Sequence, residues 1–321
     1  MIFIYKIDYE KIRENISLLN KSDYLVIKSN AYGFGFKKIL EIAVNCKMYK
    51  FAVIDIDDAI FIKKNYPKTR VLLLGVIDQN NLELCEKYNI EVTINKVNDV
   101  KFIYGHNVNI QIEINSGMNR FGIRPKELKR LISLLHYLNI NITGIYSHNA
   151  TKDTKFINDQ LKLFYESIES IKGVDVHYSS SYLKDYKINS QTARRIGECI
   201  YRDALTVYGK IIQINSLEKD EYIGYDFSYK MKRDGFIGVV DIGYADGLER
   251  KCEGFEVFIK DRYYPLVGRA CMNHCFVLLE DDKLLNEIVI FIGNGNNISN
   301  YVNYFDKINH EIYLSYLKSF K

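Results

Sequence analysis

The sequence predicts an α/β protein, in which an N-terminal (β/α)8 barrel is followed by a smaller, mostly-β domain. Two observations lead to this fold class. Up to about residue 208, eight short apolar runs alternate with segments whose apolar residues recur three or four positions apart, which is the helical period. Beyond that point the helical period fades, and short strands separated by glycines and charged turns follow. A chain of 321 residues is long enough for both domains.

The expected elements of the barrel follow chain order. A helix over residues 9–19 precedes the first strand, and further helices are expected over residues 125–135 and 159–168. The eight strands are expected at residues 24–27, 51–55, 71–74, 92–94, 110–114, 142–146, 174–177 and 199–201. A doubly wound sheet is the competing architecture, but the count of eight and the polar residues that follow the strands favour a barrel.

The β domain is expected to contain strands at residues 236–243, 255–259 and 287–292. We assign residues 8–211 to the barrel and residues 212–321 to the β domain, to which residues 1–7 could add a strand.

Composition excludes several classes of protein. The 44 basic and 40 acidic residues are spread along the chain, so they create no field suited to nucleic acid. The first residues lack the pattern of a signal peptide, and no apolar run approaches membrane-spanning length. The six cysteines have no disulfide-framework spacing, so we expect a reducing, cytoplasmic location. Cys271, His274 and Cys275 stand too close together for a tetrahedral zinc site, and we expect no metal.

Polar residues follow the expected strands, and the carboxyl ends of barrel strands form the active-site face of such folds. These residues are Lys28 after the first strand, residues 115–120 after the fifth, Ser147 and His148 after the sixth, residues 177–181 after the seventh and Arg202 after the eighth. A lysine at such a position can be desolvated, which lowers its pKa and lets it form a Schiff base. Together with serines and backbone amides suited to a phosphate, this lysine indicates pyridoxal 5′-phosphate. A sugar-phosphate aldolase would also use a lysine and a phosphate site, but it would not need the motifs of the β domain.

Five motifs in this order resemble the alanine racemase family over nearly the whole chain. They are Ile27-Lys-Ser-Asn-Ala-Tyr-Gly33, Ser116-Gly-Met-Asn-Arg-Phe-Gly122, Ser147-His148, Ile242-Gly-Tyr-Ala-Asp-Gly247 and Val267-Gly-Arg-Ala-Cys-Met272. The resemblance implies a barrel and a β domain joined as a head-to-tail homodimer with shared sites. It also implies a racemase that uses pyridoxal phosphate, most simply for D-alanine and peptidoglycan. A racemase for serine or a larger amino acid, a barrel-type pyridoxal phosphate decarboxylase and a non-catalytic cofactor-binding protein stay open as alternatives.

The resemblance also implies roles for individual residues. Lys28 would hold the cofactor covalently and act as one base, and Tyr244 of the partner subunit would act as the opposite base. The other expected roles are pyridine-nitrogen contact for Arg202, supported by His177; ring packing for His148; phosphate binding for Tyr32, Ser181 and the amides of Ala204 and Leu205; and substrate-carboxylate binding for Arg120 and the backbone of Met272.

The chain departs from the family pattern at several positions. Where many members have a carbamylated lysine, this chain has Glu113, and we expect its carboxylate to pair with Arg120, directly or through a water. Ser180, Ala204 and Asn273 replace an asparagine, a glycine and an aspartate of the family. A late tyrosine that contacts the phosphate has no clear counterpart, and Tyr316 or Lys318 is the expected substitute.

Overall fold

The protein is described by a computed structural model, which covers residues 4–151, 153–169, 171–183 and 191–317. The chain forms two compact units. One, here called the barrel unit, contains Arg13–Ala31 and Gly35–Ile200; the other, the β unit, contains Met1–Ile12, Tyr32–Phe34 and Tyr201–Lys321. The division therefore falls at residue 201, earlier than the boundary we expected after residue 211.

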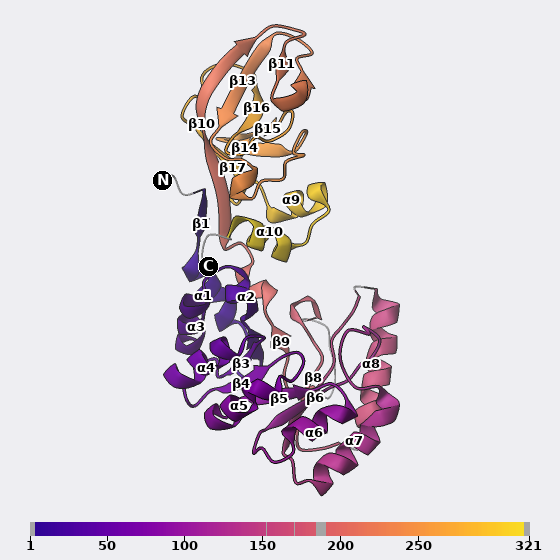
Figure 1. Ribbon diagram of the computed structural model, residues 1–321. Coiled ribbons are helices and arrows are strands. Elements are labelled where there is room, and N and C mark those ends of the chain that lie inside the picture. The colour runs from indigo at the N-terminus through magenta and orange to yellow at the C-terminus, as the bar shows by residue number, and fades with distance from the viewer. Residues whose placement is uncertain (1–3, 152, 170, 184–190, 318–321) are drawn as a thin grey trace. The chain divides into compact units, whose positions relative to one another are not determined.

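The barrel unit is built on eight parallel strands, of which β3, β4, β5, β6, β8 and β9 are labelled in Figure 1. Their order in the sheet is β8-β7-β6-β5-β4-β3-β2-β9. A parallel bridge between His177 and Ala193 brings the last strands together, and the Arg195 amide donates to Ser179 O over 2.8 Å. These contacts nearly close the sheet into the predicted barrel. The strands are β2 (Tyr24–Val26), β3 (Lys50–Val53), β4 (Arg70–Leu73), β5 (Glu91–Ile94), β6 (Ile110–Glu113), β7 (Ile142–Tyr146), β8 (Asp175–His177) and β9 (Arg195–Ile196).

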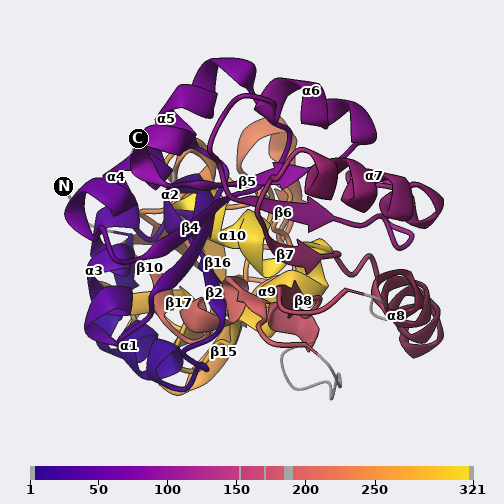
Figure 2. The same ribbon diagram turned by 90° about the horizontal axis from the view of Figure 1, so that it is seen from below.

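Helices cover the outside of these strands (Figure 2). Residues at their N-termini determine where three of them begin. The Asp55 carboxylate accepts the Asp57 amide at the start of α4, and the Asp153 carboxylate accepts the Lys155 amide at the start of α8. Pro125 occupies the first turn of α7. No helix among the described residues is both long and apolar enough to span a membrane. The helices of this region are α1 (Tyr9–Ser17), α2 (Lys28–Tyr32), α3 (Phe36–Asn45), α4 (Ile56–Asn65), α5 (Leu82–Tyr88), α6 (Val100–Ile103), α7 (Pro125–Tyr137) and α8 (Thr154–Ile168).

Seven barrel strands lie where the sequence predicted them, to within one or two residues at most ends, but the eighth prediction was wrong. Residues 199–201 belong to the 3₁₀ helix η4 (Glu198–Tyr201), and the eighth strand is the two-residue β9. The apolar run Cys199-Ile-Tyr201 is buried like a strand, whereas β9 begins with a charged residue, so the hydrophobic pattern selected the wrong segment.

The β unit contains a seven-stranded sheet whose longest member is β10 (Leu205–Leu217). The main path of the sheet runs β15-β14-β17-β10-β13-β16, and β1 (Tyr5–Ile7) pairs antiparallel with the start of β10. The remaining elements are β11 (Tyr222–Ile223), β12 (Tyr229–Lys230), β13 (Gly235–Val240), β14 (Glu256–Ile259), β15 (Arg262–Pro265), β16 (Cys275–Leu279), β17 (Ile288–Ile292), α9 (Ile298–Phe305) and α10 (Asn309–Tyr316). The antiparallel sheet confirms the predicted β domain, while the two C-terminal helices were not predicted.

Candidate active site

Lys28 directly follows the end of strand β2, and the backbone after it takes an unusual course. Residues 29–32 have positive φ angles of 53°, 52°, 53° and 58°, although none of them is glycine. Left-handed backbone costs roughly 1–2 kcal/mol per residue for most L-amino acids. Asn30 compensates in part, because its side chain accepts the Phe36 amide over 2.7 Å and its carbonyl accepts the Gly35 amide. Such strain is typical of segments that position a functional group.

The environment of Lys28 favours its neutral form. Burial lowers the pKa of the Lys28 ammonium below its ordinary value, and the positive charge of Arg120 lowers it further. A larger share of neutral amine makes this lysine a better nucleophile and base.

Four basic groups influence one another at the strand ends. Burial lowers the pKa of His148 to about 3, and the charges of Arg195, Arg120 and Lys28 act in the same direction. The imidazole of His148 is therefore neutral, while the two arginines remain charged. Because Glu113 is the anion that acts on both arginines, the site carries an excess of positive charge. An anionic ligand would balance that excess.

Glu113 ends strand β6 and is buried. Burial raises the pKa of its carboxyl group, against the opposing effects of Arg195 and Arg120. The Tyr146 hydroxyl donates to the carboxylate over 3.3 Å. Within the described part of the chain, no direct ion pair joins Glu113 to Arg120, so the expected direct pairing is not seen.

Arg195, which the sequence analysis did not select, is the arginine that contacts the predicted histidines. Its Nη1 lies 2.8 Å from His177 Nδ1 and donates to His177 O over 2.9 Å. Its Nη2 donates to Ser147 O over 2.5 Å and lies 3.4 Å from His148 Nδ1. Its guanidinium also stacks over the Tyr146 ring, 4.5 Å from the ring centre.

The prediction that His177 supports Arg202 was therefore wrong: His177 contacts Arg195. The error follows from the misplaced eighth strand, since Arg202 follows residues 199–201 and belongs to the β unit. Hydrophobic periodicity gave no signal for Arg195, because it begins a strand of only two residues.

The Ser181 hydroxyl accepts hydrogen bonds from two backbone amides. Its Oγ accepts the Gly197 amide over 2.9 Å and the Cys199 amide over 3.4 Å. Backbone amides that converge beside a hydroxyl are suited to phosphate oxygens. In contrast, the Ala204 amide already donates to Tyr201 O over 3.2 Å, and Leu205 is paired with Ile7 in the sheet. Ser181 and residues 197–199 thus form one polar group, whereas residues 204–205 belong to the β unit, and the phosphate role of their amides stays a prediction.

The β unit holds the other predicted residues. Tyr244 begins the 3₁₀ helix η6 (Tyr244–Asp246), and its amide donates to Cys271 O over 3.0 Å, while the Ala245 amide donates to Met272 O over 2.9 Å. These two hydrogen bonds hold the segments of Tyr244 and Met272 side by side, and the two residues are 42% and 56% exposed. A Cβ atom at Gly243 would lie 2.3 Å from Met272 O, so only glycine fits this junction.

The positions of Tyr32, Tyr316 and Lys318 do not test their predicted contact with a phosphate. The Tyr32 ring lies against Tyr201 and His310, with ring centres 5.5 and 5.1 Å apart. The Tyr316 hydroxyl is buried 3.1 Å from that of Tyr301, and Lys318 lies outside the described residues. Within the described ranges, no three His, Cys, Asp or Glu side chains are grouped so that they could hold a metal ion.

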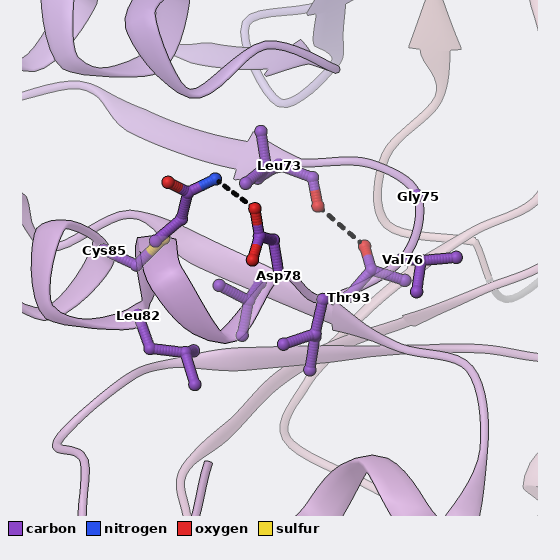
Figure 3. A pocket seen from close by; sticks show the side chains of 10 residues that line it. Leu73, Gly75, Val76, Asp78, Leu82, Cys85 and Thr93 are labelled. Carbon is purple, nitrogen blue, oxygen red and sulfur yellow. Dashed lines mark hydrogen bonds between the residues drawn. The ribbon is translucent and has the colours of Figure 1, made fainter. Parts of the chain in front are cut away.

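Two of the hollows formed by the described residues lie in the barrel unit. One lies beside β4 and β5 and contains none of the predicted site residues (Figure 3); its lining includes Leu73, Val76, Leu82, Cys85 and Thr93. The other lies at the strand ends and is lined by Glu113, Ile114, Asn115, Ser116, Met118, Phe121, Ser147 and His148. The second hollow is lined by Glu113 and His148, whose pKa values are affected by Arg195 and Arg120, so we take it as part of the candidate site.

Comparisons with known proteins show the family of the chain. The family models described as "Alanine racemase, N-terminal domain" and "Alanine racemase, C-terminal domain" match residues 7–204 and 204–321. An alanine racemase of Streptococcus pyogenes is 28% identical over 349 residues, which cover 96% of this chain and 94% of that protein. The crystal structure of alanine racemase from E. faecalis superposes with a TM-score of 0.86 at 24% identity, covering 97% of this chain and 95% of that one. A histidine racemase from Leuconostoc mesenteroides superposes with a TM-score of 0.79 at 16% identity, covering 98% and 94%.

Proposed function

The chain belongs to the alanine racemase family, which makes it an isomerase of the racemase class, and from this premise we propose that it interconverts L-alanine and D-alanine. The observation that carries the proposal is the desolvated Lys28. It lies near Arg120, which with Arg195 also acts on His148 and Glu113, the carboxylate among the described residues on which both arginines act. The curated relatives that match the chain along its length are named alanine racemases, which favours alanine over other substrates.

The residues at the strand ends fit pyridoxal 5′-phosphate. Lys28 would attach it, Ser181 and the amides near Gly197 would hold its phosphate, and His148 would lie beside its ring. Its negative charge would balance the excess of positive charge at the site. When bound, this cofactor withdraws electrons from the α-carbon of an amino acid and so makes the α-proton acidic.

We further propose that two bases act on opposite sides of the α-carbon. Lys28 Nζ would take the proton on one side, helped by the lowered pKa of its amine. Tyr244 Oη of the partner subunit would return a proton on the other side, because a racemase must exchange protons at both faces. The exposure of Tyr244 and Met272 in the single chain supports a homodimer in which these loops enter the partner's site.

Arg195 and Arg120 have different proposed tasks. Arg195 replaces Arg202 in our assignment as the group that faces the pyridine nitrogen. Because an arginine remains protonated at ordinary pH, it can donate a hydrogen bond there but does not readily give up a proton. Arg120, with the backbone of Met272, would bind the substrate carboxylate.

A panel of L-amino acids in deuterated water tests the proposal. A racemase returns both enantiomers with deuterium at the α-carbon, and L-alanine should be the best substrate by chiral chromatography. The panel includes serine and histidine, since one structural relative is a histidine racemase. Release of carbon dioxide would indicate a decarboxylase instead, and neither product would indicate a cofactor-binding protein.

A cytoplasmic location, where D-alanine would be made for peptidoglycan, is also proposed. All six cysteines are free thiols in the structure, which supports a reducing compartment. Fractionation of the source cells followed by detection of the protein would test this.

A further inference from the structure

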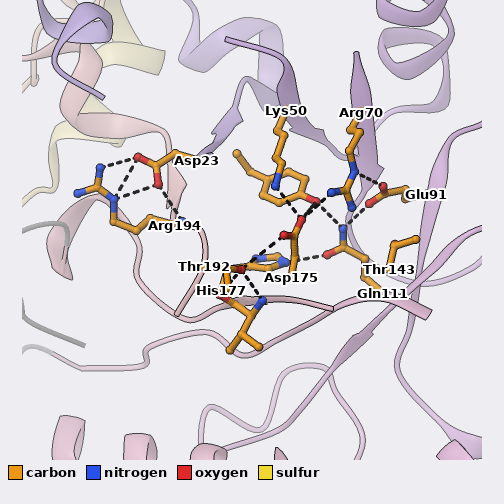
Figure 4. Close-up of polar contacts among 12 residues, drawn as sticks. Asp23, Lys50, Arg70, Glu91, Gln111, Thr143, Asp175, His177, Thr192 and Arg194 are labelled. Atoms are coloured by element: carbon orange, nitrogen blue, oxygen red, sulfur yellow. Dashed lines mark hydrogen bonds and ion pairs between the residues drawn. The ribbon is translucent and has the colours of Figure 1, made fainter. Parts of the chain in front are cut away.

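A chain of polar side chains that includes Glu91, Gln111 and His177 crosses the interior of the barrel unit (Figure 4). Beyond the residues labelled there, His177 contacts Arg195. Gln111 lies at the centre of this chain of side chains, on strand β6, and is fully buried. The Gln111 amide contacts Tyr24, Glu91 and His177. Gly144, on the neighbouring strand β7, leaves room for this side chain, because a Cβ atom there would lie 2.8 Å from Gln111 Cδ.

The partners of Gln111 determine the direction of its amide. Its Nε2 donates to the Glu91 carboxylate and to the Tyr24 hydroxyl, the latter over 2.9 Å. The Glu91 carboxylate is ion-paired with Arg70 and has no hydrogen to donate. The Tyr24 hydroxyl uses its own hydrogen on the Asp175 carboxylate, 3.0 Å away. Both neighbours therefore require donors, and the amide must turn its oxygen to the other side.

That oxygen determines the tautomer of His177. Gln111 Oε1 lies 2.7 Å from His177 Nε2, so Nε2 must carry the hydrogen. Burial lowers the pKa of His177 well below its ordinary value, and Arg195, Lys50 and Arg70 lower it further, so the ring is neutral. Nδ1 then has a free lone pair and accepts from Arg195 Nη1.

The position of the imidazole is fixed by stacking as well. Its ring lies between those of Tyr24 and Tyr146, with centres 4.9 and 5.0 Å away and planes inclined by 23° and 22°. Held on both faces and at both nitrogens, His177 offers Arg195 an acceptor at a fixed point.

The remaining hydrogens of Arg195 can be counted. Its two Nη1 hydrogens have acceptors on His177, and its two Nη2 hydrogens face Ser147 O and His148 Nδ1. Within the described residues, the fifth hydrogen, on Nε, has no acceptor. Arg195 is thus held by four contacts that leave one donor for a ligand.

We propose that Gln111 is a positioning residue, which fixes His177 in the Nε2–H tautomer and thereby holds Arg195 with its Nε–H free for the ring of the cofactor. The part of this inference that names the cofactor rests on the proposed function. The tautomer itself does not, because it follows from contacts within the barrel unit.

The first test is nitrogen NMR of the cofactor-free protein labelled with ¹⁵N-histidine, in which the His177 signal is identified by its loss in His177→Gln. We expect protonated Nε2, unprotonated Nδ1, a hydrogen-bonded Nε2–H proton at low field and no titration between about pH 5 and 8. An Nδ1–H tautomer, or an imidazolium at neutral pH, would overturn the inference whether or not the protein is a racemase.

The second test replaces Gln111 with an apolar side chain of similar length. In Gln111→Met the low-field Nε2–H signal should disappear, and titration with pyridoxal 5′-phosphate, followed by its absorbance, should show about tenfold weaker binding. The control is Lys50→Met, which removes a 2.8 Å ion pair with Asp175 in the same network but leaves Gln111 in place. It should keep the His177 spectrum and bind the cofactor within about twofold of wild type.

The two tests separate the two proposals. If wild-type protein shows the expected tautomer but binds no pyridoxal phosphate, the proposed function fails and the tautomer assignment stands. If a folded Gln111→Met protein keeps the His177 signal or binds the cofactor as tightly as wild type, Gln111 has no positioning role. Should Gln111→Met not fold, the wild-type spectrum still decides the tautomer.

Discussion

The barrel unit and the β unit place their polar groups in opposite ways. In the barrel unit, Gln111, Glu113, His177 and Arg195 are buried, and each is held by neighbouring side chains or backbone atoms. In the β unit, the sheet interior is apolar, and the candidate catalytic side chain, Tyr244, is exposed on a loop. Buried polar groups need partners, which makes them rigid, whereas an exposed group can serve a second molecule. The polar side chains of the barrel unit are therefore preorganised. The β unit instead presents an exposed side chain that could complete a site in another molecule.

The largest effect should come from the lysine of the preorganised site. Lys28→Ala removes both the point of cofactor attachment and one base, so turnover of L-alanine should fall by at least about 10⁴-fold. Borohydride reduction of the wild-type protein with pyridoxal phosphate should label Lys28, as read by peptide mass spectrometry. The matched control is Lys38→Ala, whose ammonium is exposed and paired with Glu41. A label on another lysine would contradict the assignment.

The exposed tyrosine gives the next effect, and it tests whether the β unit serves a second chain. Tyr244→Phe should lower racemisation by about 10²–10⁴-fold, while Tyr222→Phe, at an exposed position in the same unit, should not. Mixing Lys28→Ala with Tyr244→Phe subunits should restore up to about a quarter of wild-type activity, because each random heterodimer has one intact site. If the mixture forms heterodimers yet stays inactive, the sites are not shared between subunits.

The comparison also explains what could be predicted from the sequence. The alternation of strands and helices and the residues after the strands selected Lys28, His148 and His177, because parallel strands bring their carboxyl ends together. Glu113 was selected by the resemblance to the family instead. Gln111 was missed because a polar residue inside a strand reads as solvent-facing, although β6 directs both Gln111 and Glu113 into the interior.

Two further features had no usable sequence signal. The left-handed turn of residues 29–32 contains no glycine, so turn rules do not predict it. Strand β9 has only two residues and begins with an arginine, so hydrophobic periodicity could not find it.

The third prediction sharpens the correction from Arg202 to Arg195. In Arg195→Lys, a single ammonium replaces a planar group that makes contacts through both Nη atoms, so several buried acceptors lose their donors. We expect cofactor affinity to fall by about ten- to a hundredfold. Arg202→Lys is the matched control and should change the affinity by less than about threefold. Absorbance titration with pyridoxal phosphate measures both, and the reverse order of effects would restore the original assignment.

The smallest effect is expected from Glu113→Gln, where stability and activity should move differently. Burial raises the pKa of the Glu113 carboxyl group in the folded protein, so the folded state holds its proton to higher pH than the unfolded state does. The stabilisation from this group is therefore complete below about pH 4 and is lost as pH rises through the folded-state pKa. A glutamine cannot ionise, so the variant should be as stable as wild type at acidic pH and equally or more stable at pH 7, as measured by thermal unfolding.

The turnover of the Glu113→Gln variant should nevertheless fall by about tenfold, because Arg195 and Arg120 lose the carboxylate that acts on both. If Glu113 takes the place of a carbamylated lysine, wild-type activity should not depend on carbon dioxide, and mass spectrometry should find no carbamate at this position. Unchanged turnover in Glu113→Gln would show that the carboxylate serves only the barrel interior, and a clear loss of stability at pH 7 would show that its charge is compensated better than burial indicates.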